Sequence, residues 1–216
     1  NKQEAKKQAA AAQEPTVEYT IQESFSEEAL LEAQKLPTSI PQNEIMRRRD
    51  MRDTLTFTID PDEAKDFDDA ISFKILDTGN YQIGVHIADV THYVHEFTAL
   101  DDEAYQRGTS VYFVDRVVPM LPEQLSNQLC SLRPNEDKLC MSVILEMDQQ
   151  AKVIRHKICR TVICSNHRLT YRQAQNILDN VEVPADKHLA QALLSINALA
   201  KLLRANRFRQ GAINFE

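Results

Sequence analysis

The sequence lacks the features that mark a membrane or secreted protein. No apolar stretch in its 216 residues approaches the roughly 20 residues that a membrane-spanning helix needs. The opening segment, Asn1 to Lys7, is polar and charged and has no apolar region of the kind that a secretory signal contains. We therefore expect no membrane partner. Because the first residue is Asn1 rather than Met, we also expect a piece of a longer protein.

The sequence has no C-x-x-C pair and no internal repeat. Its cysteines stand at irregular spacings, at Cys130, Cys140, Cys159 and Cys164. Without a signal peptide, this pattern predicts buried, reduced thiols in a cytoplasmic protein, with a disulfide or a zinc cluster as the alternative.

His92 and His95 are separated by two residues, but no cysteine or acidic motif completes a zinc site around them, so structural roles are favoured.

The chain has few features of disorder and an uneven charge. Hydrophobic residues make up 43% and charged residues 26%, which is typical of a globular protein. A length of 216 residues allows one sizeable core, or one domain plus a tail. The net charge is −7, but residues 50–69 hold eight acids and two bases, whereas residues 152–210 hold eleven bases and three acids. Such asymmetry can separate a metal site from a polyanion-binding surface, and a solvated basic helix face is the alternative.

Local patterns predict an α+β fold with a mixed, mostly antiparallel sheet and surrounding helices. Residues 1–24 are interpreted as a tail or a linker from a preceding domain. Ser24 with Glu27 predicts a capped helix that ends near Leu36. A linker to the basic cluster 47–49 is expected after this helix. Period-2 alternation predicts strands over 55–59, 71–75, 81–87, 111–114, 139–147 and 153–164. Helices are expected over 100–106, over 123–129, after the Thr170–Gln173 capping pair, and over 189–203 with Gly211 at its end.

Four aspartates between two predicted strands form the most informative stretch: Asp60, Asp66, Asp68 and Asp69. Converging carboxylates raise one another's pKa unless a cation neutralises them, and a hard divalent ion such as Mg²⁺ or Mn²⁺ is the natural solution. An EF-hand is excluded because Lys65 and Ile71 occupy the positions that need Gly and Glu. A solvated acidic loop without a metal remains the alternative.

Longer motifs resemble the catalytic (RNB) domain of the ribonuclease II/ribonuclease R superfamily, and are closest to bacterial ribonuclease R. The resemblance spans residues 25–216, which are identified as the N-terminal portion of that domain. It departs from the family pattern at Val114, where Pro is usual, and at Asn214, where Asp is usual. The motifs that carry it are residues 49–53, 58–61, 64–70, 84–94, 108–113 and 115–122.

The resemblance implies a 3′-to-5′ exoribonuclease that hydrolyses single-stranded RNA processively to nucleoside 5′-monophosphates. It implies that Mg²⁺, or Mn²⁺ in its place, is held by catalytic carboxylates, with Asp60 and Asp69 as direct ligands and Asp66 and Asp68 completing the shell or orienting the water. Tyr112 matches the family aromatic that stacks on a base, and Arg116 would contact phosphate. The alternative is a non-catalytic RNA-binding relative with the same fold, which would be expected to lose one or more of these aspartates.

The resemblance also implies missing parts. Family members carry cold-shock domains before this region and an S1 domain after it, and their catalytic domain continues beyond the equivalent of Glu216. We therefore expect that the isolated fragment binds metal but does not hydrolyse RNA, because a phosphate-binding arginine of the family lies in the later part. We also expect uncovered apolar surface and self-association of the fragment.

Overall fold

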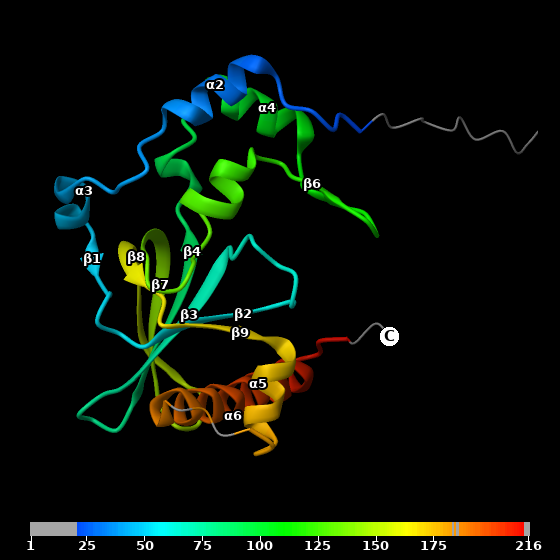
Figure 1. Ribbon diagram of the computed structural model, residues 1–216. Helices are drawn as coiled ribbons and strands as arrows, with labels where there is room; N and C mark the ends of the chain where they lie inside the picture. Colours follow the sequence, from blue (N-terminus) through cyan, green and yellow to red (C-terminus); the bar gives the residue numbers. More distant parts are fainter. Residues whose placement is uncertain (1–20, 183, 185, 214–216) are drawn as a thin grey trace, which may run out of the picture.

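The computed structural model describes residues 21–182, 184 and 186–213. Most of the predicted tail, residues 1–20, therefore lies outside the described residues, as does Asn214. Figure 1 shows a central sheet with helices above and below it. In chain order the elements are α2 (Glu27–Lys35), α3 (Gln42–Arg47), β1 (Arg49–Asp50), β2 (Thr56–Asp60), β3 (Asp69–Ile75), β4 (Tyr81–Ala88), a 3-10 turn (Val90–His92), α4 (Ala99–Arg107), β5 (Val111–Tyr112), β6 (Val117–Val118), a π-helical turn (Leu125–Leu129), β7 (Asp137–Met147), β8 (Val153–Cys164), β9 (His167–Thr170), α5 (Tyr171–Leu178) and α6 (Lys187–Arg209).

The main sheet has seven strands in the order β1-β8-β7-β4-β3-β2-β9. The two predicted hairpins, β3–β4 and β7–β8, are both antiparallel and pair directly with each other through β4 and β7. Of the strands in this sheet that the structure describes, the two edge strands are the ones parallel to their neighbours, β1 to β8 and β9 to β2. The predicted α+β class with a mostly antiparallel sheet is thus confirmed.

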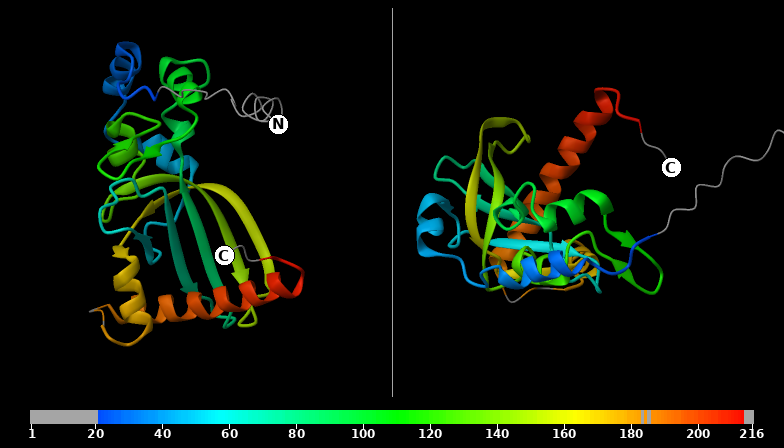
Figure 2. Two further views of the ribbon diagram at one scale, coloured as in Figure 1. Left: turned by 90° about the vertical axis from the view of Figure 1, so that its right-hand side faces the viewer. Right: turned by 90° about the horizontal axis from the view of Figure 1, so that it is seen from above.

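Each face of the sheet has its own hydrophobic core. Helices α5 and α6 cover one face, where Phe57, Phe73 and Met147 pack against Leu189 and Leu193. Figure 2 shows α6 crossing under the strands near one end of the sheet. The opposite face packs near the other end of the strands against α2, α4 and the loops between strands, in a cluster that includes Ala33, Leu100 and Leu132. Because both faces of the sheet are covered, the threonine side chains of β2, Thr56 and Thr58, are buried as well.

Several predicted helix ends are confirmed, and others need correction. Gly108 ends α4 in the left-handed region (φ 71°), and Thr170 and Gln173 form the predicted capping box of α5. The cap of α2 is Ser26 rather than Ser24, because Ser26 is the residue whose hydroxyl accepts from Ala29 N. The predicted linker after Pro37 contains the short helix α3. The predicted strand 111–114 is shorter than expected, because β5 spans Val111–Tyr112. The parallel strand β9 was not predicted.

A buried polar row runs across the middle of the sheet. His86 is fully buried, with Nδ1 2.7 Å from Ser142 Oγ and Nε2 2.8 Å from Ser72 Oγ, and Ser142 Oγ is 2.6 Å from Thr161 Oγ1. Burial lowers the pKa of His86 to about 4, so the ring is neutral at physiological pH. A Cβ on Gly84 would lie 2.3 Å from Ser72 Oγ, so only glycine leaves room for this row. His86 therefore has a structural role.

A buried ion pair holds β1 and the segment after β4 together. Arg48 is 6% exposed, and its Nη1 lies 2.8 Å from Asp89 Oδ2 while its Nε lies 2.7 Å from Glu44 Oε1. Burial on its own would raise the pKa of Asp89, but the Thr91 hydroxyl and the Arg48 guanidinium outweigh it, so the pKa is lowered. Arg48 is thus committed to the fold, whereas its neighbours in the 47–49 cluster are exposed.

All four cysteines are free thiols, as predicted. Cys130 and Cys140 are buried, and burial raises the pKa of Cys130 to about 12. Within the described ranges, no helix combines the length and apolar character needed to cross a bilayer.

Candidate active site

The four aspartates lie at the junction of β2 and β3. Asp60 is the last residue of β2 and Asp69 the first of β3, while Asp66 and Asp68 belong to the connecting loop. The sequence therefore placed the cluster correctly, although Asp66 and Asp68 precede the strand rather than enter it. Asp60 is 9% exposed, and its Oδ2 atom is buried without a hydrogen-bond partner among the described residues.

The loop is held in place from inside the protein. Phe67 is buried, its N–H donates to Ser131 Oγ (3.0 Å), and its carbonyl accepts from Leu132 N (2.8 Å). The Ser131 hydroxyl in turn donates to the Lys65 carbonyl (2.8 Å). These bonds fix the backbone between Asp66 and Asp68, so the two carboxylates are positioned by the core.

The carboxylates act on one another electrostatically. Burial is the main reason that the pKa of Asp60 is raised, and the charges of Asp69 and Asp66 add to it. The pKa of Asp68 is also raised, first by the protein packed around its carboxyl group and then by Asp66, Asp69 and Asp60. Such mutual repulsion is the state that a bound cation would relieve.

The donor chemistry of the cluster fits a hard divalent cation. All four groups offer carboxylate oxygens, which suit Mg²⁺ and Mn²⁺, and Asp60 Oδ2 is buried with an unsatisfied lone pair. Among the residues that the structure describes, however, no three His, Cys, Asp or Glu side chains are already arranged as a complete metal site. Metal binding by Asp60, Asp66, Asp68 and Asp69 therefore stays a prediction.

The aspartate loop opens into a cavity of about 670 Å³. One wall carries Asp60, Asp66 and Asp68, and the facing wall is the β5–β6 hairpin, residues 112–117. Figure 1 shows this hairpin projecting from the body of the molecule. Asp69 is not among the lining residues, although its charge acts on both Asp60 and Asp68.

Tyr112 and Arg116 both line this cavity, but their surroundings differ. Tyr112 is 65% exposed and donates a hydrogen bond from its hydroxyl to Asp66 Oδ2 (3.2 Å), so it is not a core tyrosine. Burial and the Asp66 carboxylate raise its pKa. Arg116 forms ion pairs with Glu23 (2.7 Å) and Asp115 (3.2 Å). An RNA phosphate would have to compete with these two carboxylates for Arg116.

Arg168 is a site residue that sequence reasoning missed. It lies on β9 opposite Thr58 of β2, and its Nη2 donates to the carbonyls of Pro61 (2.5 Å) and Asp62 (2.9 Å). Its charge lowers the pKa of Asp60 in opposition to burial. Arg168 thus positions the start of the aspartate loop. The only available signal was the alternation in the four residues His167–Thr170, which is too short to predict a strand.

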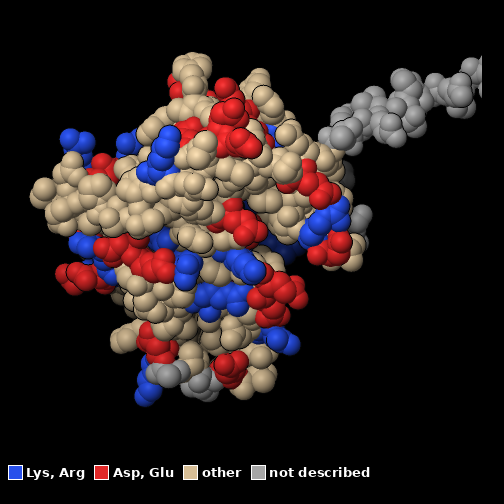
Figure 3. All heavy atoms as spheres, turned by 45° about the horizontal axis from the view of Figure 1, so that its top comes forward, with Lys and Arg blue, Asp and Glu red and all other residues tan. Residues whose placement is uncertain are grey.

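The predicted separation of charge is only partial. Arg168, from the basic half of the sequence, lies at the aspartate loop itself. Figure 3 shows acidic and basic side chains side by side on one face of the molecule rather than in separate regions. The basic residues after Lys152 are spread over β8, β9, α5 and α6.

Comparison with known proteins places this chain in a family. The RNB domain model matches residues 48–216, and the chain belongs to the RNB-domain family of ribonucleases. It is 44% identical over 198 residues to ribonuclease R 1 of Lactococcus lactis, covering 91% of this chain and 24% of that protein. The resemblance inferred from the sequence motifs is confirmed.

Solved structures agree with this assignment. Mycoplasma genitalium RNase R in complex with ribose-methylated single-stranded RNA superposes with a TM-score of 0.83 at 34% identity, covering 90% of this chain and 30% of that one. Yeast Ssd1, a pseudonuclease, has the same fold at 21% identity, with a TM-score of 0.69, 80% of this chain covered and 21% of that one. The chain spans about a quarter of the length of the curated relatives it matches, 24% and 28% for two ribonucleases R.

Proposed function

We propose that this chain is the carboxylate-bearing part of a magnesium-dependent 3′-to-5′ exoribonuclease that degrades single-stranded RNA processively to nucleoside 5′-monophosphates. The observation that carries the proposal is the facing pair of cavity walls, with Asp60, Asp66 and Asp68 on one side and exposed Tyr112 on the other. A cytoplasmic location is part of the proposal and is supported by the four free thiols.

Each side chain has a proposed task. Asp60 and Asp69, at the two strand ends, would hold the cation directly, while Asp66 and Asp68 would complete its shell or orient the attacking water. When bound, the cation supplies Lewis acidity and lowers the pKa of that water. Attack on phosphorus breaks the bond to the 3′ oxygen of the preceding nucleotide, so the phosphate leaves with the released nucleoside. Tyr112 would stack on a base near the cleaved end, which holds any sequence because every base has a π-face.

A binding-only relative is the second candidate, and the similarity of the fold to a pseudonuclease makes it concrete. Loss of catalysis in such a protein is expected to accompany loss of a metal-binding carboxylate. All four aspartates are present in this chain, which favours the catalytic proposal.

Product analysis tests the proposal in a protein of the relatives' full length that carries this chain. With poly(A) labelled along its length and Mg²⁺, we expect release of labelled 5′-mononucleotides from the 3′ end without accumulation of chains of intermediate length, and no reaction with EDTA. Endonucleolytic fragments, or no hydrolysis under any metal condition, would contradict it.

The isolated chain should behave differently. We expect it to bind Mn²⁺, to bind RNA weakly and with strong salt dependence, and to release no mononucleotides. We also propose that it self-associates through the sheet face beyond α6, where Val85, Ile87, Met141 and Ile158 are exposed. A monomer in sedimentation equilibrium at all concentrations would contradict this last point.

Replacing Tyr112 by Ala should weaken the hold on the RNA 3′ end. The loss of base stacking is expected to cost about 1–3 kcal/mol of binding, seen as weaker affinity for short oligonucleotides and longer limit products in the full-length protein. Tyr105→Ala is the matched control, because Tyr105 is 88% exposed on α4, outside the cavity. Identical end-product length and short-RNA affinity in both variants would rule out stacking by Tyr112.

A further inference from the structure

The basic cluster 47–49 noted in the sequence is divided by the fold. Arg48 is buried in its ion pairs. Arg49 lies on the edge strand β1 and lines a separate pocket of about 390 Å³, at the edge of the sheet opposite to β9. The other lining residues come from β4, β7 and β8: Gln82, Ile144, Glu146, Arg155, His156 and Lys157. The pocket lies outside the candidate active site and shares no residue with the aspartate cavity.

The charges of this pocket do not cancel. Arg155 Nε lies 2.5 Å from Glu146 Oε2, and the other oxygen of Glu146 accepts from Asn80 Nδ2 (2.8 Å), so this carboxylate is occupied. Hydrogen bonds from Asn80 and Arg155 hold the pKa of Glu146 below its usual value. Within the described part of the chain, neither Arg49 nor Lys157 forms an ion pair or a side-chain hydrogen bond. Two exposed cations are therefore left without a compensating charge.

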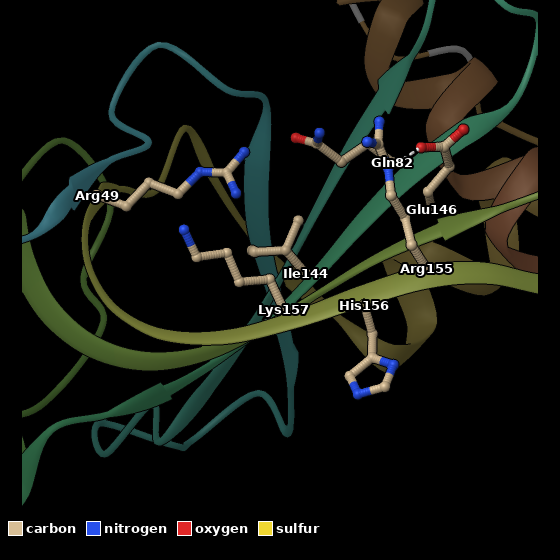
Figure 4. Close-up of a pocket in the computed structure, with 7 residues that line it drawn as sticks. All are labelled: Arg49, Gln82, Ile144, Glu146, Arg155, His156 and Lys157. Atoms are coloured by element: carbon tan, nitrogen blue, oxygen red, sulfur yellow. Dashed lines mark hydrogen bonds and ion pairs between the residues drawn. The ribbon is translucent and has the colours of Figure 1, made fainter.

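The two cations converge on one side of the sheet. Figure 4 shows the ends of Arg49 and Lys157 close together, with Ile144 beside Lys157, while His156 points away on the other side of β8. Strand pairing brings the two residues to the same face, because β1 runs parallel to β8 with Arg49 opposite Thr161, and Lys157 lies four residues before Thr161 on β8.

The pocket faces the same side of the sheet as Asp60. One row of paired residues crosses five successive strands, and its members share one face of the sheet. From β2 to β8 the row is Thr56, Ser72, Gly84, Ile144 and Lys157. Alternate side chains of a strand lie on the same face, and Asp60 is four residues after Thr56 in β2, so Asp60 belongs to that face as well. From β2 to β8 there are four strand spacings, which is roughly 19 Å at about 4.8 Å each.

We infer that Arg49 and Lys157 bind phosphate groups of an RNA strand whose 3′ end lies in the aspartate cavity. The inference rests on the proposed function in that RNA is the polyanion. Two exposed, unpaired cations on an open surface suit successive backbone phosphates, which carry no sequence information. A closed site for one small anion would instead present buried donors, and both cations here are exposed.

The test compares two charge-neutralised variants of this chain. Arg49→Gln/Lys157→Gln removes the pocket cations, and Lys35→Gln/Lys201→Gln removes two exposed cations from α2 and α6. Affinity for single-stranded RNA is measured in EDTA by fluorescence anisotropy at several salt concentrations, with oligonucleotides of about 4 and about 16 nucleotides, the range of single-strand site sizes. Mn²⁺ binding is measured separately by calorimetry.

For the longer RNA, the pocket variant should bind about tenfold more weakly than the control variant, and its salt slope should fall by about 1.4, or about 0.7 for each phosphate contact. For the shorter RNA, the two variants should be equal. Equal affinities and slopes for the longer RNA would overturn the inference. Failure of the proposed function would appear elsewhere, as absent Mn²⁺ binding in the unaltered chain.

Discussion

Replacing Asp68 by Asn should abolish RNA hydrolysis in the full-length protein and leave RNA affinity nearly unchanged. The substitution keeps the shape of the side chain but removes a negative charge from a cluster in which Asp68 interacts with Asp60, Asp66 and Asp69. Metal-assisted stabilisation of the transition state contributes several kcal/mol, so a loss of at least about a thousandfold in turnover is expected. Binding should persist because lysine and arginine contacts to phosphate supply most of the affinity.

The control for this substitution is Asp77→Asn, at an exposed aspartate in the β3–β4 turn. Turnover by release of mononucleotides and affinity in EDTA are measured for both variants. Because burial, and then the neighbouring carboxylates, raise the pKa of Asp68, the metal-free Asp68→Asn protein should also be more resistant to thermal unfolding. Near-normal turnover in Asp68→Asn would remove Asp68 from the catalytic set.

Replacing Asp89 by Ala should destabilise the fold strongly without touching the candidate active site. Arg48 would remain buried with Glu44 as its charged partner and the Cys140 carbonyl as a hydrogen-bond acceptor at 3.4 Å. Breaking a buried ion pair by removing one member costs about 3–5 kcal/mol. In a chain of this size that corresponds to a fall in Tm of roughly 10 °C. Differential scanning calorimetry at neutral pH measures the effect.

The acid dependence of stability provides a second measurement for the same ion pair. The pKa of Asp89 is lowered in the folded protein, so its stabilising contribution is present above the unfolded value of about 3.9 and is lost as the pH falls through the folded value.

The double variant Arg48→Met/Asp89→Leu should recover most of the stability, because it leaves no unpaired buried charge. A double variant as unstable as Asp89→Ala would show that the ion pair is not the cause.

Sequence patterns were most successful where a signal is local. The β3–β4 and β7–β8 hairpins and the end of α4 at Gly108 follow from alternation and turn residues. The strand β9 could not be predicted, since its pairing with β2 depends on residues about a hundred positions away, as in the bond from Thr56 N to Asn166 Oδ1. Its four residues give too short a periodic pattern, and tertiary contact alone makes it a strand.

The candidate site was predictable to a similar degree. The aspartates are adjacent in sequence and form a motif, so their location at one strand junction was expected. Arg168 was hidden because its effect on Asp60 arises from strand pairing. Arg49 was visible only as part of a basic cluster, and the sequence could not tell which of its arginines would be buried in an ion pair.

The parallel pairing of β9 with β2 has a consequence for synthesis of the protein. Arg168 binds the carbonyls of Pro61 and Asp62 across 107 and 106 positions, so a ribosome must add all of those residues before the aspartate loop acquires its clamp. At about 5–20 residues per second this takes roughly 5–20 s. During that interval the hairpins between them can already form, but β2 has an open edge, and the loop is held only by β3 and by its hydrogen bonds with Ser131 and Leu132. The start of the aspartate loop would therefore be fixed late, after most of the sheet has formed.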